Sequence, residues 1–283
     1  MIGFYNINKP VGMGSASVVS KIKRITKAKC GHLGTLDPMA TGVLPVAVGK
    51  ATKLFDYFLN KDKRYFAIGK FGVLTDTLDS EGKVIKRDNK KITLQDINSV
   101  INEFVGEISQ VPPIYSSVNV DGKRAYDIAR SGKEIELNPR KINVYSLSAQ
   151  EYSNEDCFSF EIHCSAGTYV RALIRDIAEK LGTVATTVCI IRTASGPFKI
   201  EDSYLLEDVE NGDAKLIDIA DVIDLPKHEI LEEEKIKLLN GMNVKINLND
   251  GESLCYYKGN IIGIVETKQG YSKIKINLWE NVW

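Results

Sequence analysis

The segment CGHLGTLDPMATG, residues 30–42, constrains the fold more than any other, because its three glycines and one proline suit neither a helix nor a regular strand. Before it, residues 15–25 follow a helical pattern in which Ser15 is the expected cap. After it, residues 43–48 form an apolar run typical of a buried strand. The segment is therefore predicted to be a loop held between packed elements.

Strand and helix patterns alternate through the rest of the first 200 residues. Strands are predicted at residues 3–7, 64–71, 143–152, 157–164 and 186–193. Helices are predicted at 52–59, at 93–104, where Thr93 and Asp96 have the spacing of a capping box, and after Gly167. Arg171 falls on the polar side of the last of these helices. Residues 110–141 differ, since three prolines and two glycines surround a short helical stretch near 126–130. They are predicted to be a long functional insertion.

The pattern of predicted elements changes near Leu225-Pro226, where a linker is expected. A predicted helix at 232–239, closed by Gly241, is followed by four short β-like runs. Such a series of runs predicts a small barrel. We therefore predict two domains, residues 1–225, which include the insertion, and residues 226–283.

Charge is unevenly distributed, although the formal net charge of the 283 residues is zero. Residues 1–75 hold twelve Lys or Arg against three acids, whereas residues 201–235 hold thirteen acids against three lysines. We expect a basic face and an acidic back on one molecule, and the basic part suits contact with nucleic acid. Asp37 is the first carboxylate of the chain, so it lies among cations.

The sequence also argues against several classes of protein. Apolar residues at 43% and charged residues at 26% are typical of a folded globular protein. Five scattered cysteines without a CxxC pair and three distant histidines argue against a disulfide framework and a protein-bound metal. GVLPVAVGKATK lacks the first glycine of a P-loop. The absence of a secretory signal and of an apolar run of membrane length predicts a cytoplasmic protein without membrane contact.

Asp37 has two interpretations. It precedes Pro38, and this pair also begins helices, with Asp as the N-cap and Pro at the first helical position. Gly42 follows only four residues after Pro38, which leaves little room for a helix. A carboxylate in a cationic groove stays ionised, which suits a nucleophile or a base. From these residues alone, a helix cap and a reacting carboxylate both stay open.

An ordered series of motifs spans nearly the whole chain. The motifs are NKPVG, GHLGTLDPMATGVLPVAVGKATK at residues 31–53, DKRY ending at Tyr65, QVPPIYSS, GTYVR ending at Arg171, and IRTASGPF. Through them the chain resembles the TruB family of tRNA pseudouridine-55 synthases. The longest motif resembles the active-site loop of that family and its following strand, and the nucleophilic aspartate of the family matches Asp37.

The resemblance implies roles for further residues. Tyr65 would stack on the target base and take a proton, and Arg171 would pair with Asp37 through bidentate hydrogen bonds. His32 would occupy the space that the flipped nucleotide leaves. Two more residues in matching motifs, Lys9 and Arg192, would contact the substrate. The sequence departs from the family pattern at four positions, Gly14, Asn119, Thr186 and Ile191. These departures concern RNA contacts rather than Asp37, Tyr65 and Arg171.

The same resemblance implies an α+β fold, with a large mixed, mainly antiparallel sheet, flanking helices and a small C-terminal PUA-like β-barrel. The partner implied is the T-stem-loop of tRNA, with uridine 55 as the target. A stand-alone monomer without an obligatory protein partner is expected.

Conversion of uridine to pseudouridine changes no oxidation state and loses no group, so neither a cofactor nor a metal is expected. A carboxylate is needed to trap or stabilise an electron-poor carbon, as in glycosidases. Two alternatives have the same fold. One is a non-catalytic RNA-binding protein or tRNA chaperone, and the other is a guide-RNA-dependent enzyme such as dyskerin, which needs protein partners.

Overall fold

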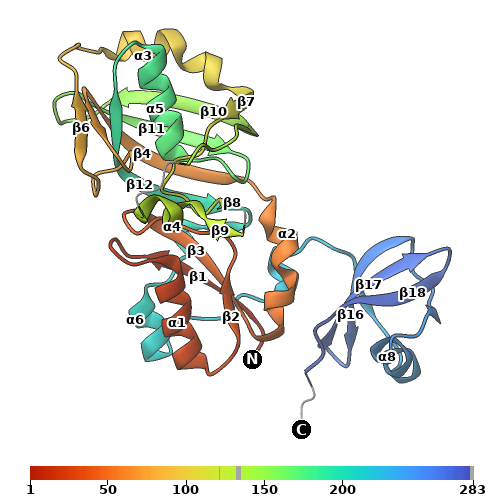
Figure 1. Ribbon diagram of the computed structural model, residues 1–283. Coiled ribbons are helices and arrows are strands. Elements are labelled where there is room, and N and C mark those ends of the chain that lie inside the picture. The colour runs from red at the N-terminus through yellow and green to blue at the C-terminus, as the bar shows by residue number, and fades with distance from the viewer. Residues whose placement is uncertain (121, 132–134, 281–283) are drawn as a thin grey trace.

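The computed structural model describes residues 1–120, 122–131 and 135–280. A nine-stranded sheet forms its centre within those ranges, with the main order β1-β3-β12-β4-β11-β10-β7 (Figure 1). Its strands are β1 (Gly3–Lys9), β2 (Cys30–His32), β3 (Thr41–Val48), β4 (Lys63–Phe71), β7 (Gly106–Gln110), β10 (Arg140–Glu151), β11 (Cys157–Cys164), β12 (Ala185–Ser195) and β13 (Phe198–Lys199). Only β3 and β12 pair in parallel, which confirms the predicted mixed, mainly antiparallel sheet.

Helices cover one face of this sheet (Figure 1). In one half lie α3 (Leu94–Val100), η2 (Ile101–Phe104) and α5 (Val170–Lys180), and in the other half α1 (Ser15–Thr26) and α6 (Leu206–Asn211). Shorter elements are η1 (Gly49–Leu54), α2 (Phe55–Leu59), η3 (Ile200–Asp202) and α7 (Ile219–Val222). The apolar stripe predicted for α5 is buried and packs into the main core beneath it.

Two helix starts test the predicted caps. Thr93 and Asp96 form the predicted capping box at the start of α3. Ser15, however, is not the cap of α1, since Gly14 holds that position without a side-chain hydrogen bond. The Ser15 hydroxyl instead accepts from the backbone N–H of Leu36, at 2.8 Å. The predicted cap is therefore wrong, because a tertiary contact with the 30–42 loop takes the side chain.

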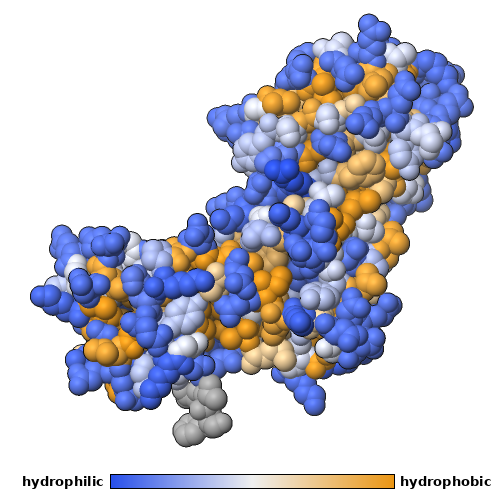
Figure 2. All heavy atoms as spheres, turned by 180° about the vertical axis from the view of Figure 1, so that it is seen from behind, coloured by the Kyte–Doolittle hydropathy of each residue, from blue (hydrophilic) through white to orange (hydrophobic). Residues whose placement is uncertain are grey.

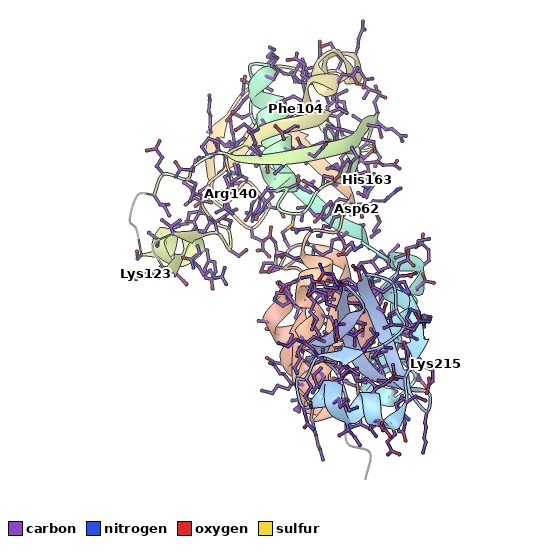
Figure 3. The ribbon with its side chains drawn as sticks, turned by 90° about the vertical axis from the view of Figure 1, so that its right-hand side faces the viewer. Asp62, Phe104, Lys123, Arg140, His163 and Lys215 are labelled. Atoms are coloured by element: carbon purple, nitrogen blue, oxygen red, sulfur yellow. The ribbon has the colours of Figure 1, made fainter. Side chains whose placement is uncertain are left out.

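The predicted insertion begins at the end of β7 and returns to the sheet at β10. It contains β8 (Asn119–Val120), β9 (Lys123–Arg124) and α4 (Ala125–Arg130), while residues 121 and 132–134 lie outside the described residues. Figure 3 shows Lys123 pointing away from the body of the molecule. A second excursion, the hairpin β5 (Val73–Thr75) and β6 (Val84–Arg87), carries Asp79 in its turn.

The C-terminal part forms a separate five-stranded sheet, order β14-β16-β17-β18-β15, with α8 (Glu232–Leu239) beside it. Its strands are β14 (Lys227–Glu229), β15 (Val244–Lys245), β16 (Gly251–Tyr257), β17 (Asn260–Lys268) and β18 (Tyr271–Asn277). All four predicted runs contribute strands, and this curled sheet agrees with the predicted PUA-like barrel. None of the helices in the described ranges is long and apolar enough to cross a membrane.

This C-terminal sheet shares an apolar core with the rest of the molecule. Leu254, Ile264 and Leu278 are fully buried in one cluster with Phe4 and Leu54. Seen from behind, apolar side chains gather where the two parts meet (Figure 2). The sheet is therefore packed against the body of the protein by continuous apolar contact.

Candidate active site

Asp37 lies in a turn. Its carbonyl accepts a hydrogen bond from the backbone N–H of Ala40 at 3.1 Å, with Pro38 in the second position that β-turns favour. No helix begins at Pro38, and the next helical element along the chain is η1. The helix-cap interpretation is therefore wrong, since the Asp37 carboxylate does not cap a helix.

Three buried side chains hold the loop around Asp37. The Lys9 ammonium donates to the carbonyls of Met13 (2.6 Å) and Pro38 (3.2 Å). Ser15 exchanges two hydrogen bonds with the backbone of Leu36. Arg192 donates to the carbonyls of Gly34 and Thr35. These directional contacts fix the backbone on both sides of the carboxylate.

Gly42 allows the loop to join the sheet closely. It has φ +95°, and a Cβ there would lie 2.3 Å from the carbonyl oxygen of Arg192. The two residues are register partners in the parallel pairing of β3 with β12. A side chain at this position would push the loop off the strand that supports it, so the glycine is required by both space and backbone conformation.

Arg171 connects Asp37 with two other segments. One terminal nitrogen, Nη2, lies 2.7 Å from Oδ2 of Asp37 and also donates to the carbonyl of Tyr115. The other, Nη1, lies 3.1 Å from Oδ2 of Asp79 and donates to the carbonyl of Thr77. The expected bidentate pairing with Asp37 alone is therefore wrong, because the fork is shared between two carboxylates. The side chain is 4% exposed, so this arginine on the polar side of α5 faces the site and not solvent.

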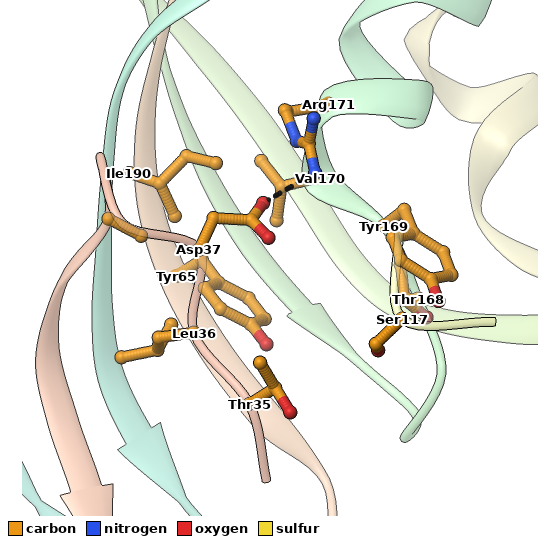
Figure 4. Close-up of a pocket in the computed structure, with 11 residues that line it drawn as sticks. Thr35, Leu36, Asp37, Tyr65, Ser117, Thr168, Tyr169, Val170, Arg171 and Ile190 are labelled. Carbon is orange, nitrogen blue, oxygen red and sulfur yellow. Dashed lines mark ion pairs between the residues drawn. The ribbon is translucent and has the colours of Figure 1, made fainter. Parts of the chain in front are cut away.

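Tyr65 and Asp37 line one cavity of about 90 Å³. Figure 4 shows them on one side, with Arg171 above and Ser117, Thr168 and Tyr169 facing them. Burial raises the pKa of the Tyr65 phenol, and the positive charge of Arg192 opposes that rise. The phenol therefore keeps its proton at neutral pH.

Lys9 and Arg192, for which substrate contact was expected, are enclosed. Lys9 is 0% exposed and Arg192 is 1% exposed, and both donate to backbone carbonyls around the loop. Burial lowers the pKa of Lys9 to about 8, although nearby Asp37 opposes this shift. Neither side chain is open to a ligand in this structure.

His32 lies on β2 beside the loop and is half-buried. Burial, followed by the charge of Arg192, lowers the pKa of its imidazole, so the ring is neutral at physiological pH. Its Nδ1 atom is buried and has no hydrogen-bond partner among the described residues. His32 does not line the cavity, and its expected role in base flipping stays a prediction.

Comparison with known proteins identifies the family. The sequence model described as TruB family pseudouridylate synthase (N terminal domain) matches residues 22–170. The chain belongs to this family. A protein named tRNA pseudouridine synthase B from Caldanaerobacter subterraneus is 43% identical over 89% of this chain and 89% of its own. One of the same name from Clostridium tetani is 41% identical over 98% of this chain and 99% of its own.

Solved structures show a similar fold. A crystal structure of a Cbf5-Nop10-Gar1 complex contains a chain that superimposes with a TM-score of 0.71 and 25% identity, covering 99% of this chain and 86% of that one. A structure of an H/ACA RNP bound to a substrate RNA containing 2'-deoxyuridine matches with a TM-score of 0.70, the same identity and the same coverage. The fold expected from the resemblance is confirmed.

Two residues of this TruB-family site were not predicted from the sequence. Asp79 is a buried second partner of Arg171 and also accepts from the Thr77 hydroxyl at 2.6 Å. Gln110 exchanges two hydrogen bonds with the backbone of Tyr169, just before α5. The available signal was weak, namely an acidic turn after a strand and a glutamine that opens the QVPPIYSS motif.

Proposed function

We propose that this protein isomerises a uridine of tRNA, at position 55 in the T-loop, to pseudouridine. The observation that carries the proposal is the ion pair of Asp37 with buried Arg171 at the wall of a cavity that Tyr65 also lines. Relatives that align over most of their length and are named tRNA pseudouridine synthase B support tRNA as the substrate. Position 55 rests on the resemblance of the motifs.

The reaction needs only groups that the site contains. The bond from N1 to C1′ of the ribose breaks, the base turns, and a bond from C5 to C1′ forms. N1 gains a proton and C5 loses one, so atoms and charge balance without a redox partner. Asp37 traps or stabilises the electron-poor carbon, Arg171 pairs with this carboxylate and aims it, and Tyr65 packs on the base. Attack of Asp37 on the sugar and on the base are both compatible with this geometry.

The cavity accepts a base only after it has left the helical stack. Flipping costs a few kcal/mol, which contacts with the rest of the RNA must offset. The basic residues of α1, the insertion and the C-terminal sheet are the surfaces that we assign to those contacts. We further propose that the enzyme acts as a cytoplasmic monomer without an obligatory protein partner.

The test is incubation of the purified protein alone with an unmodified tRNA transcript, followed by nucleoside analysis under single-turnover conditions. Wild type is expected to form pseudouridine, and a transcript with cytidine at position 55 is expected to give none. Asp37→Asn preserves the shape and removes the charge, so we expect turnover to fall to the detection limit with unchanged thermal unfolding. Since one anion near phosphate is lost, tRNA affinity should hold or rise.

Two outcomes would contradict the proposal. Wild type that binds tRNA without forming pseudouridine would favour the non-catalytic RNA-binding alternative, or a need for partners as in guide-RNA-dependent enzymes. An active Asp37→Asn enzyme would remove Asp37 from the chemistry.

A further inference from the structure

Arg192 is a buried cation without a carboxylate partner. It is 1% exposed, and it forms no ion pair in the part of the chain that the structure describes. Burial lowers the pKa of its guanidinium, and the Tyr65 phenol and the Asp37 carboxylate oppose that shift. An arginine that is costly to bury in this way needs a reason in the function or in the fold.

The donors of Arg192 are directed at the loop that carries Asp37. Nε donates to the carbonyl of Val43 at 2.7 Å, Nη2 to Gly34 at 3.0 Å and Nη1 to Thr35 at 3.2 Å. A guanidinium has five N–H donors in a rigid plane, so these contacts fix the direction of several carbonyls at once. Thr35 lines the cavity, whereas Arg192 does not.

Arg192 also reaches Tyr65, its register partner across the pairing of β12 with β4. The positive charge of the guanidinium acts on the phenol. Figure 4 shows the Tyr65 ring beside Asp37 at the cavity.

We infer that Arg192 is a positioning residue for the reaction, which acts through the Tyr65 hydroxyl and the carbonyls of residues 34–35 and does not touch the substrate. This inference rests on the proposed function, because its effect is measured in pseudouridine formation. One rigid fork thereby fixes the loop that carries the carboxylate, and its charge acts on the phenol that lines the same cavity. Misplacement of a reacting group by about 1 Å can cost about 100-fold in rate.

A double-mutant cycle tests the inference. Arg192→Lys keeps the charge but loses the fork, so single-turnover pseudouridine formation should slow by about 100-fold while tRNA affinity stays unchanged. In a Tyr65→Phe background the same substitution should slow the reaction by a clearly smaller factor, because the hydroxyl beside which the fork places its charge is already gone. Ser15→Ala is the matched control, since Ser15 tethers the same loop through Leu36. Its slowing factor should be equal in both backgrounds.

Equal factors for Arg192→Lys in both backgrounds, or a loss of tRNA affinity that matches the loss of rate, would overturn the inference. A second measurement needs no substitution and holds even if Arg192→Lys fails to fold. Wild type is treated with phenylglyoxal, and modified arginines are mapped by mass spectrometry. Arg192 should stay unmodified with and without tRNA, and modification that tRNA prevents would mark it as a substrate contact. Wild-type activity on the transcript is measured in parallel, so failure of the proposed function is seen separately.

Discussion

The loop around Asp37 and the C-terminal sheet are fixed to the central sheet in different ways. Polar side chains that are themselves buried hold the loop, with Lys9, Ser15 and Arg192 each bonded to its backbone. The C-terminal sheet shares an apolar cluster with the body, in which Leu254 lies with Phe4, and polar contacts such as that of the Tyr57 hydroxyl with Glu252 also cross this boundary. Hydrogen bonds are directional and apolar contact is not, so the first arrangement specifies position and the second supplies stability.

This contrast predicts that substitutions in the two regions have different effects. Changes around the loop should act on the rate of chemistry more than on folding. Changes in the shared apolar cluster should lower the free energy of unfolding and leave the chemistry of the remaining folded protein intact.

Among the variants that test this contrast, Arg171→Lys gives the largest expected effect. The variant keeps a positive charge but cannot reach Asp37 and Asp79 together, so pseudouridine formation should slow by about 100-fold or more under single-turnover conditions. Arg175→Lys is the matched control on the same helix, because Arg175 donates to the carbonyl of Val111 and makes no recorded contact with Asp37. A similar loss in both variants would mean that the helix, and not the ion pair, is what matters.

Leu254→Ala tests the apolar region. Leu254 is fully buried in the shared cluster, so we expect the free energy of unfolding to fall by about 2–5 kcal/mol in urea titrations, with single-turnover rate unchanged at low temperature. Ile262→Ala, in the separate cluster of the C-terminal sheet, is the control. If the two regions unfold together, both variants should show one transition for all probes, and two separated transitions would contradict the shared core.

Truncation is a stricter form of this test. The sequence-based boundary at 225/226 predicts that removal of residues 227–283 leaves a folded catalytic fragment. The structure changes that expectation, because Leu254 and Leu278 belong to one apolar cluster with Phe4 and Leu54, and the cut would remove them from it. Because the cut removes part of this shared cluster, we expect an aggregating fragment. A soluble fragment with a cooperative thermal transition would show that the catalytic part is independent.

The N-terminal and C-terminal parts of the molecule also differ in charge. Reversing Lys21, Lys23 and Lys27 on α1 should weaken tRNA binding and reduce the salt slope by about 0.7–0.9 per lost phosphate contact. Substitution of Glu232–Glu234 at the start of α8 by glutamine should not weaken tRNA binding. Glutamine still caps that helix, so the control keeps the fold. Equal losses of affinity, measured across a salt series, would contradict the proposed basic face.

The sequence predicts local features of the molecule well. The loop at residues 33–40 follows from glycine and proline, although the predicted bounds of 30–42 are too wide, since β2 covers Cys30–His32 and β3 begins at Thr41. The capping box of α3 follows from the spacing of Thr93 and Asp96. Contacts between distant segments are not predicted in the same way. Asp79 and Arg171 are 92 residues apart, and nothing in either local pattern indicates the pairing. Apolar runs likewise show that Leu254 is buried but not which side chains bury it, so the shared core is visible only in the structure.

The smallest expected effect concerns the pH dependence of the polar region. Burial lowers the pKa of Lys9 to about 8 from 10.5, so between these values the unfolded chain binds more protons at this group than the folded one. Its contribution to the free energy of unfolding therefore rises as pH increases through that window, and the burial penalty is fully present below about pH 8. Lys9→Met removes the titration, so the stability difference, wild type minus variant, should grow from about pH 8 to about pH 10 in urea titrations. The Leu254→Ala difference, which involves no titrating group, should stay flat over the same range. A stability difference for Lys9→Met that does not change with pH, or one for Leu254→Ala that does, would contradict the distinction between polar and apolar attachment.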